Sequence, residues 1–205
     1  MILLVVLTKM ADKPQTQTFE DRPPIENQPT IGKKDAKVSI VEFGDYKCPS
    51  CKAWGEQIFP RLTKDYVDTG KVSFSYINVF FHGPESKLAA LAAESIYAQN
   101  PEAYWTFHKE VFNAQPKEDH DAQWVTLDKL IQIARTSTPQ IDVKKMEGDM
   151  QSELMQSHIR LDENLTTQYR VEETPTIMIN GTVVANPFDY DQIKSMIESK
   201  LGESK

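Results

Sequence analysis

The amino-acid sequence predicts an α/β fold in which a small mixed β-sheet is flanked by helices and carries an inserted helical subdomain. Three observations support this prediction. Residues 37–79 have the pattern of a strand, a helix and a second strand. The following stretch, up to residue 169, shows helical periodicity. Residues 174–201 then return to two short strands joined by a tight turn and followed by a last helix.

The first strand–helix–strand unit is the clearest part of the pattern. The segments "KVSIVEF" (37–43) and "KVSFSYINV" (71–79) are rich in β-branched and apolar residues, which is typical of buried strands. Between them, apolar side chains recur every four residues and define one face of a helix, and Pro60 should bend that helix. These apolar positions are Trp54, Ile58, Leu62 and Tyr66.

The remaining elements follow in order. Residues 85–99 place an apolar stripe on one helical face, formed by Leu88, Leu91, Ala92, Ser95, Ile96 and Gln99. Further helices are predicted from Pro101, over 124–134 and over 147–169. Asn180-Gly181 between two short strands is a strong hairpin signal, and apolar residues at helical spacing predict that 189–201 pack on the sheet.

This order is that of a thioredoxin-like domain interrupted by a helical insertion. We assign residues 36–80 and 170–205 to the discontinuous thioredoxin-like domain and residues 81–169 to the inserted helical subdomain. Residues 1–35 are predicted to be an apolar stub followed by a flexible, proline-rich linker without periodicity.

The apolar stub has two interpretations. The run from Ile2 to Leu7 spans about 9 Å as a helix, against about 30 Å of bilayer hydrocarbon, so it cannot cross a membrane by itself. It is either a remnant of a start site or cloning, or the end of a truncated membrane anchor whose tether is the linker. A signal peptide is not indicated, because no basic segment precedes the run and no small-residue cleavage site follows it.

Composition excludes one class of partner. The chain of 205 residues has a formal net charge of −7 and no cluster of Lys and Arg. A nucleic-acid-binding protein would need a basic patch, so no nucleic-acid partner is expected.

Cys48 and Cys51 are the two cysteines of the chain, and they form one CxxC motif, "CPSC". A structural zinc site would need four ligands, and the sequence has neither a further cysteine nor a His pair at ligand spacing. A static disulfide in so short a loop would stabilise the fold little. A redox-active pair is therefore the favoured interpretation. A metal held by scattered acidic side chains and carbonyls would leave no motif, so whether one binds stays unknown.

The position of the motif explains how it could be reactive. Cys48 falls where the first strand ends and a helix begins, with Pro49 suited to the first helical position. A thiolate there is stabilised by free backbone N–H groups and the positive end of the helix dipole. Cys51 lies one turn deeper, so Cys48 is the predicted attacking thiol and Cys51 the resolving thiol.

The sequence resembles the DsbA family of thiol–disulfide oxidoreductases, of the membrane-tethered BdbD type found in Gram-positive bacteria. The resemblance covers about residues 36–200 and rests on three segments: "VEFGDYKCPSC", the aromatic-rich "AYWTFHKEVF" and "VEETPTIMING". It implies a buried acid at Glu42 and a substrate-binding cis-proline at Pro175, preceded by Thr174.

The resemblance also implies an activity and a setting. The protein would introduce disulfide bonds into reduced, unfolded proteins of the cell envelope or secreted from it. A quinone-linked membrane protein of the DsbB type would reoxidise it, and no bound organic cofactor would be needed. An extracytoplasmic location, tethered through the N-terminus, follows from the same resemblance.

One residue departs from the family pattern. Ser50 stands where many relatives have histidine, so it supplies a hydroxyl but no positive charge. Pro49 and Ser50, the dipeptide that tunes the pair, lead us to expect a pKa of about 4.5 to 6 for Cys48.

Neighbouring residues have competing interpretations. Glu42 lies inside an apolar strand, where a raised pKa would suit a proton shuttle for Cys51, unless its side chain reaches solvent. Lys47 is expected to be exposed and to affect Cys48 little. Four aromatic residues are expected in the core rather than in a substrate groove, namely Trp54, Tyr104, Trp105 and Phe107.

Two other functions stay open at this point. A reductase or isomerase could use the same motif with electrons running the other way. A non-catalytic binding domain on a thioredoxin-like scaffold would not need Cys48 at all.

Overall fold

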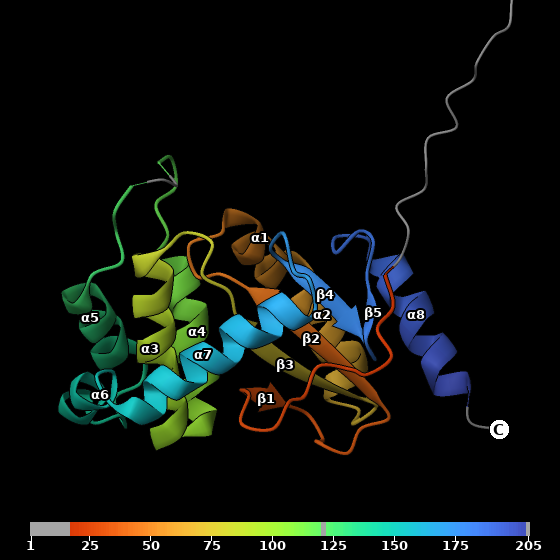
Figure 1. Ribbon diagram of the computed structural model, residues 1–205, viewed down its shortest axis with the longest axis horizontal. Helices are drawn as coiled ribbons and strands as arrows, with labels where there is room; N and C mark the ends of the chain where they lie inside the picture. The colour runs from red at the N-terminus through yellow and green to blue at the C-terminus, as the bar shows by residue number, and fades with distance from the viewer. Residues whose placement is uncertain (1–16, 120–121, 204–205) are drawn as a thin grey trace, which may run out of the picture.

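The computed structural model describes residues 17–119 and 122–203, as a five-stranded sheet with helices on both faces (Figure 1). The elements in chain order are β1 (Thr30–Ile31), β2 (Val38–Gly44), α1 (Pro49–Gln57), α2 (Phe59–Leu62), the π-helix η1 (Thr63–Val67), β3 (Val72–Asn78), α3 (Pro84–Gln99), α4 (Pro101–Asn113), α5 (Leu127–Ser137), α6 (Val143–Asp149), α7 (Glu153–Gln168), β4 (Thr176–Ile179), β5 (Thr182–Val183) and α8 (Tyr190–Gly202).

The strand order is β1-β3-β2-β4-β5, with β2 and β3 parallel and the other pairs antiparallel. The parallel β2–β3 pair confirms the predicted strand–helix–strand unit. The hairpin at Asn180-Gly181 is also confirmed, with positive φ at both residues, as a tight two-residue turn requires. The thioredoxin-like fold predicted from the sequence is thus the observed one.

Two apolar clusters cover the two faces of the sheet. On one face, Val38, Ile40 and Phe74 pack against Trp54 of α1 and Ile193 of α8. On the other face, the side chains that alternate with these contact α7; they include Val41, Phe43, Ile77 and Met178. The predicted packing of the last helix on the sheet is confirmed.

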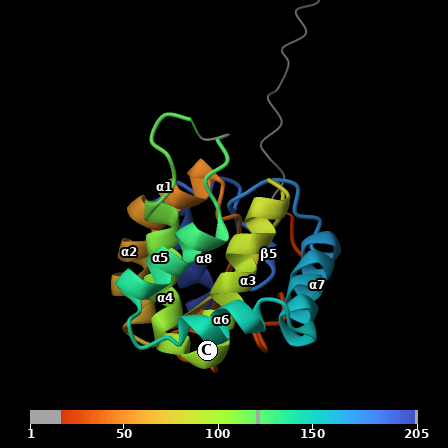
Figure 2. The same ribbon diagram turned by 90° about the vertical axis from the view of Figure 1, so that its left-hand side faces the viewer.

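Helices α3, α4, α5 and α6 lie together at one end of the sheet, and this end of the molecule faces the viewer in Figure 2. Their core is continuous with the cysteine motif, because Cys48 and Cys51 belong to the same apolar cluster as Phe107 and Leu130. The predicted stripe on 85–99 was too narrow. Ala89 and Ala93 are fully buried as well, because α3 is covered by α4 on one side and by α7 on another.

Two helical predictions need correction in their limits. The helix after the cysteine motif breaks at Ile58 and resumes as α2, with Pro60 near its start, where a missing N–H is tolerated. The stretch 147–169 is not one helix. It is divided between α6 and α7, and the side chain of Ser152 caps the second.

The prediction that a flexible, proline-rich linker follows the apolar stub as far as residue 35 is wrong for residues 17–35. Phe19 and Ile25 pack on the sheet, and β1 extends it beside β3. Gln28 is buried and donates a hydrogen bond of 2.8 Å from Nε2 to Oδ1 of Asp162 on α7. Residues 1–16, which include the apolar stub, lie outside the described residues. Within the described part of the chain, no helix has the length and apolar character needed to cross a bilayer.

Candidate active site

Cys48 is the N-cap residue of α1 and stands between the end of β2 and the first turn of the helix. It has extended backbone angles, with φ −73° and ψ 118°, and Pro49 follows at the start of the helix as predicted. The N–H of Cys48 donates to the carbonyl oxygen of Asp45 across 3.0 Å, which closes the turn between strand and helix. Both cysteines are thiols in this structure.

The surroundings of Cys48 favour its thiolate. A hydrogen bond from the Cys51 thiol, with smaller contributions from Thr174 and from the backbone N–H groups of Cys51 and Ser50, lowers the pKa of Cys48 to about 6, against the opposing effect of burial. These N–H groups are the free donors of a helix N-terminus. A pKa of about 6 stands at the upper end of the expected range and is well below that of a free thiol.

Cys51 has the opposite environment. Only 1% of its surface is exposed, and burial is the main cause that raises its pKa well above the ordinary value. The N–H of Asp45 points at its Sγ from 3.5 Å. The pair therefore combines a thiol that ionises near neutral pH with one that stays protonated until it reacts.

Glu42 occupies the third position of an apolar row on β2, after Val38 and Ile40, and faces the α1 side of the sheet. Its side chain is 3% exposed, so the interpretation that it reaches solvent is wrong. Burial, with a smaller effect from the Cys48 charge, raises the pKa of Glu42 well above its usual range. The carboxyl is therefore held in its neutral form in conditions where an exposed glutamate is ionised.

Thr174 and Pro175 reach the motif from the far end of the chain, just before β4. The peptide bond between them is cis. Sγ of Cys48 lies 3.2 Å from the carbonyl oxygen of Thr174, and the pairing of Thr176 with Phe43 aligns this segment with the end of β2. The structure thus brings Thr174, Pro175, Cys48 and Cys51 together.

Other residues of the site had not been predicted. The carboxylate of Asp45 is fully buried and accepts three hydrogen bonds. Their donors are the backbone N–H of Lys47, the backbone N–H of His82 and Nδ1 of His82. Nε2 of Gln115 donates to the carbonyl oxygens of Tyr46 and Cys48. An aspartate before a tight turn is a recognisable signal. No sequence signal identified His82 or Gln115, because they are distant from the motif in sequence and contact it only in the folded chain.

Lys47 corrects another expectation. It is 6% exposed rather than exposed, and its Nζ lies 2.8 Å from Oε1 of Glu85 on α3. The same Nζ also donates to the carbonyl oxygen of Ala122. Lys47 therefore connects the turn between β2 and α1 to the inserted helices through its ion pair with Glu85.

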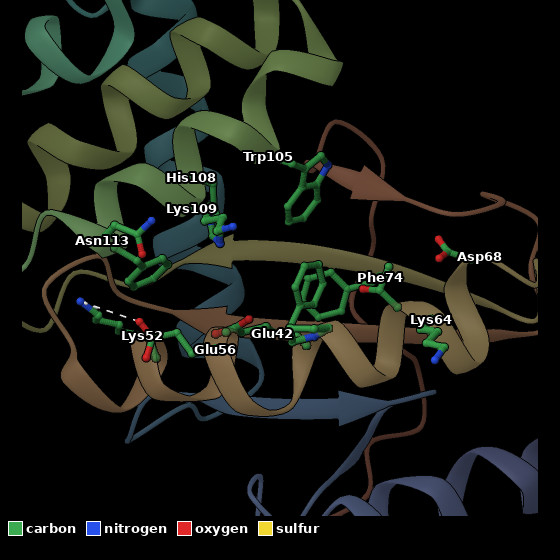
Figure 3. Close-up of a pocket in the computed structure, with 16 residues that line it drawn as sticks. Glu42, Lys52, Glu56, Lys64, Asp68, Phe74, Trp105, His108, Lys109 and Asn113 are labelled. Carbon is green, nitrogen blue, oxygen red and sulfur yellow. Dashed lines mark ion pairs between the residues drawn. The ribbon is translucent and has the colours of Figure 1, made fainter. Parts of the chain in front are cut away.

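The four aromatic residues expected in the core divide into two groups. Trp54, Tyr104 and Phe107 are fully buried, as expected. Trp105 is partly buried and lines a pocket of about 580 Å³ next to Glu42 and Cys51 (Figure 3). Among the described residues, no group of three or more potential metal ligands comes together.

Comparison with known proteins places this geometry in a family. The family described as thioredoxin matches residues 25–199 of the chain. The chain is also 43% identical over 180 residues to disulfide bond formation protein D of Bacillus subtilis, covering 88% of this chain and 80% of that one.

The chain belongs to the thioredoxin family, in the group of disulfide bond formation protein D. A probable member of the same group from Bacillus anthracis is 37% identical over 174 residues, covering 85% of this chain and 78% of that protein. The crystal structure of oxidised BdbD from Bacillus subtilis superposes with a TM-score of 0.83 and 41% identity, covering 90% of this chain and 98% of that chain.

A less similar structure shares the fold. The DsbA structure from Chlamydia trachomatis has a TM-score of 0.74 at 22% identity, covering 87% of this chain and 94% of that one. The resemblance stated from the sequence segments around Glu42, the cysteines and Pro175 is therefore confirmed at the level of family and fold.

Proposed function

We propose that this protein is a thiol–disulfide oxidoreductase that introduces disulfide bonds into secreted or cell-envelope proteins through Cys48 and Cys51. The observation that carries the proposal is the contrast between the two thiols: the pKa of Cys48 is lowered to about 6, whereas that of Cys51 is raised. Stabilising the Cys48 thiolate stabilises the reduced pair, which makes the disulfide form a stronger oxidant. The names of the relatives, disulfide bond formation protein D, agree with this direction.

The reaction has two exchange steps. A substrate thiolate attacks Sγ of Cys48 in the oxidised pair, the Cys48–Cys51 bond breaks, and Cys51 leaves as a thiolate that takes up a proton. A second substrate thiolate then attacks the substrate sulfur of the mixed disulfide and releases Cys48 as a thiolate. The substrate loses two electrons and gains one disulfide, and the cysteine pair gains two electrons.

Glu42 is proposed as the proton shuttle for Cys51. The neutral carboxyl is buried on the Cys51 side of the sheet and can give a proton to the departing Cys51 thiolate. During reoxidation the carboxylate accepts the proton of Cys51 when that thiol attacks. Pro49 and Ser50 tune the pair from within the first turn of the helix, where the N–H of Ser50 contributes to the low pKa of Cys48.

Thr174 and Pro175 are proposed to bind the substrate backbone. The carbonyl oxygen of Thr174 lies next to the reactive sulfur, and an extended peptide could align along this segment by backbone hydrogen bonds. Reduced, unfolded chains are the natural partners for such backbone binding. Reoxidation is assigned to a quinone-linked membrane protein of the DsbB type, with no organic cofactor bound to this chain. We also propose an extracytoplasmic location, with residues 1–7 as the end of a membrane anchor.

The test is the oxidation of a reduced, unfolded ribonuclease by the oxidised protein. We expect recovery of ribonuclease activity with the wild type and none with Cys48→Ser. In Cys51→Ser, Cys48 is first converted to a mixed disulfide with glutathione; a substrate thiolate should then displace glutathione and leave a detectable mixed disulfide between Cys48 and the substrate. Retained activity in Cys48→Ser would refute the assignment of the nucleophile, and no oxidation by the wild type would favour a non-catalytic binding domain.

Equilibration with a glutathione buffer separates an oxidase from a reductase or isomerase. An oxidase should have a reduction potential well above the roughly −270 mV of thioredoxin. A value at or below that of thioredoxin would reverse the proposed direction of electron flow.

A further inference from the structure

The pocket beside the cysteine pair has the size of a small-molecule site. It has a volume of about 580 Å³ and lies between the α1–η1 segment and α4 (Figure 3), and neither Thr174 nor Pro175 lines it. Cavities of roughly 300 to 1,000 Å³ are typical of sites for drug-sized ligands. Cys51 lines this pocket, so a ligand here would lie against the buried half of the pair.

The walls of the pocket are aromatic. They are formed by Phe59, Phe74, Trp105 and Phe112. The rings of Phe59 and Trp105 are nearly parallel, with an interplanar angle of 21° and centroids 6.0 Å apart. Flat apolar walls of this kind favour contact with a planar aromatic molecule over filling with water.

Glu42 provides a polar group in the wall of the pocket. Glu42 is only 3% exposed, and no residue of the described chain makes a hydrogen bond to its carboxyl. In Figure 3 this carboxyl lies between α1 and α4, among the pocket-lining side chains. A buried neutral carboxyl without a partner is unfavourable, so an acceptor oxygen on a ligand would be bound preferentially.

The rim adds positive charge. Lys52, Lys64 and Lys109 line the pocket, and Lys52 pairs with Glu56 at 3.9 Å. Within the described residues, Lys64 and Lys109 have no ion-pair partner within 4.0 Å, although Asp68 also lines the far end. Lys109 follows His108 on α4 and is exposed. A negatively charged group on a ligand would be favoured on this side.

We propose that this pocket binds a planar aromatic acid, with its rings against Phe59 and Trp105, an acceptor oxygen toward Glu42 and its anionic group near Lys109. This site is distinct from the substrate segment at Thr174 and Pro175. Its occupation does not depend on the proposed redox chemistry, because binding can be measured with either redox state of the protein.

Calorimetric titration of the full chain with xanthone carboxylate tests the proposal. This probe has planar fused rings, one ketone oxygen and one carboxylate. We expect a single saturable site in the wild type. Anthracene carboxylate has similar rings and charge but no ketone, and should bind about fivefold or more weakly, since it leaves the Glu42 donor unpaired.

Gly55 offers a way to fill the pocket. It lines the pocket from α1, and a Cβ at this position would have no atom within 4 Å. Gly55→Phe should therefore abolish binding of both probes. Gly148 on α6 is the matched control, because its Cβ would be equally unobstructed and it does not line the pocket. Gly148→Phe should bind as the wild type does.

Two further variants separate the contributions of Glu42 and Lys109. Glu42→Gln keeps a donor and should keep the preference for the ketone, whereas Glu42→Leu should remove that preference. Lys109→Glu, at an exposed position, should weaken the binding of both probes several-fold. This variant tests the site even if Gly55→Phe fails to fold. No saturable binding to the wild type, or unchanged binding in a folded Gly55→Phe variant, would overturn the proposal.

Discussion

The backbone N–H of Asp45 points at Sγ of Cys51 from 3.5 Å, while its carbonyl oxygen accepts the N–H of Cys48. Asp45 thus contacts both cysteines through its backbone. Oδ2 of its buried carboxylate accepts hydrogen bonds from the backbone N–H of His82 and from Nδ1 of the same residue, the latter at 2.9 Å. We infer that His82 positions the donor that stabilises Cys51 when its thiolate forms.

Replacing His82 should therefore slow the steps in which Cys51 reacts. In His82→Ala, attack of Cys51 on a mixed disulfide between Cys48 and glutathione should be roughly three- to tenfold slower, which corresponds to one weakened hydrogen bond. His82→Asn retains a donor near the position of Nδ1 and should restore the rate. Rapid-quench measurement of glutathione release follows this step directly. Equal rates in the alanine variant and the wild type would rule out the positioning role.

The ionisation of Cys48 gives a prediction for the reduced protein. Thiolate absorbance should titrate with a midpoint near pH 6, in agreement with the lowered pKa. Because the pKa of the folded state lies below that of the unfolded chain, this group stabilises the fold fully above about pH 8.5. The stabilisation is lost as the pH falls through 6, by up to about 1.36 kcal/mol for each pH unit between the two pKa values.

Denaturant unfolding of the reduced wild type and reduced Cys48→Ser, across this pH range, measures that difference. The two proteins should converge in stability below about pH 6 and diverge as the pH rises. A midpoint above about 7.5 would contradict both the stabilised thiolate and the oxidant function.

Substitution of Glu42 should separate catalysis from stability. Glu42→Gln replaces the carboxyl by an amide that cannot take or give a proton, so the steps in which Cys51 reacts should slow on the order of tenfold to a hundredfold. Stability should change in the opposite sense. The pKa of Glu42 is raised, so the wild type loses stability as the pH rises above about 4.5, and Glu42→Gln should be more stable at pH 8.

Glu56→Gln serves as the control, because Glu56 lines the same pocket but its side chain is 55% exposed. Stopped-flow oxidation rates and urea unfolding at pH 8 report the two effects. If Glu42→Gln and Glu56→Gln react at the same rate, Glu42 is not the shuttle.

The N-terminal segment should contribute to stability. Gln28→Ala removes the 2.8 Å hydrogen bond to the buried Asp162 and should lower the free energy of unfolding by about 1–3 kcal/mol. Glu26→Ala, at an exposed neighbouring position, should change it by less than about 0.5 kcal/mol. Thermal or urea unfolding compares the two variants, and equal stabilities would show that the Gln28–Asp162 contact does not stabilise the fold.

Features set by neighbouring residues were predictable from the sequence. Pro49 after Cys48 fixes the start of α1, and Asn180-Gly181 fixes the hairpin, because turns and helix ends depend on the backbone preferences of a few adjacent residues. The apolar residues on either side of Glu42 in the predicted strand also favoured a buried position with a raised pKa, with a side chain that reaches solvent as the alternative.

Features made by distant residues were decided only by the tertiary structure. Lys47 looked exposed in the sequence, and His82 and Gln115 showed no pattern that connects them with the cysteines. All three act at the motif because the β3–α3 connection, α3 and the segment after α4 contact the turn between β2 and α1. The ordering of residues 17–35 has the same origin, since Gln28 is held by Asp162 across the fold.

The sequence by itself therefore determined the reactive pair, its place at a helix N-terminus and the fold that carries it. The tertiary structure decided how differently the two thiols ionise, what holds the turn around them and the pocket that reaches Glu42. The physical reason is that strand, turn and helix-end preferences act over a few residues, whereas burial and hydrogen bonding at this site depend on segments up to 126 residues apart.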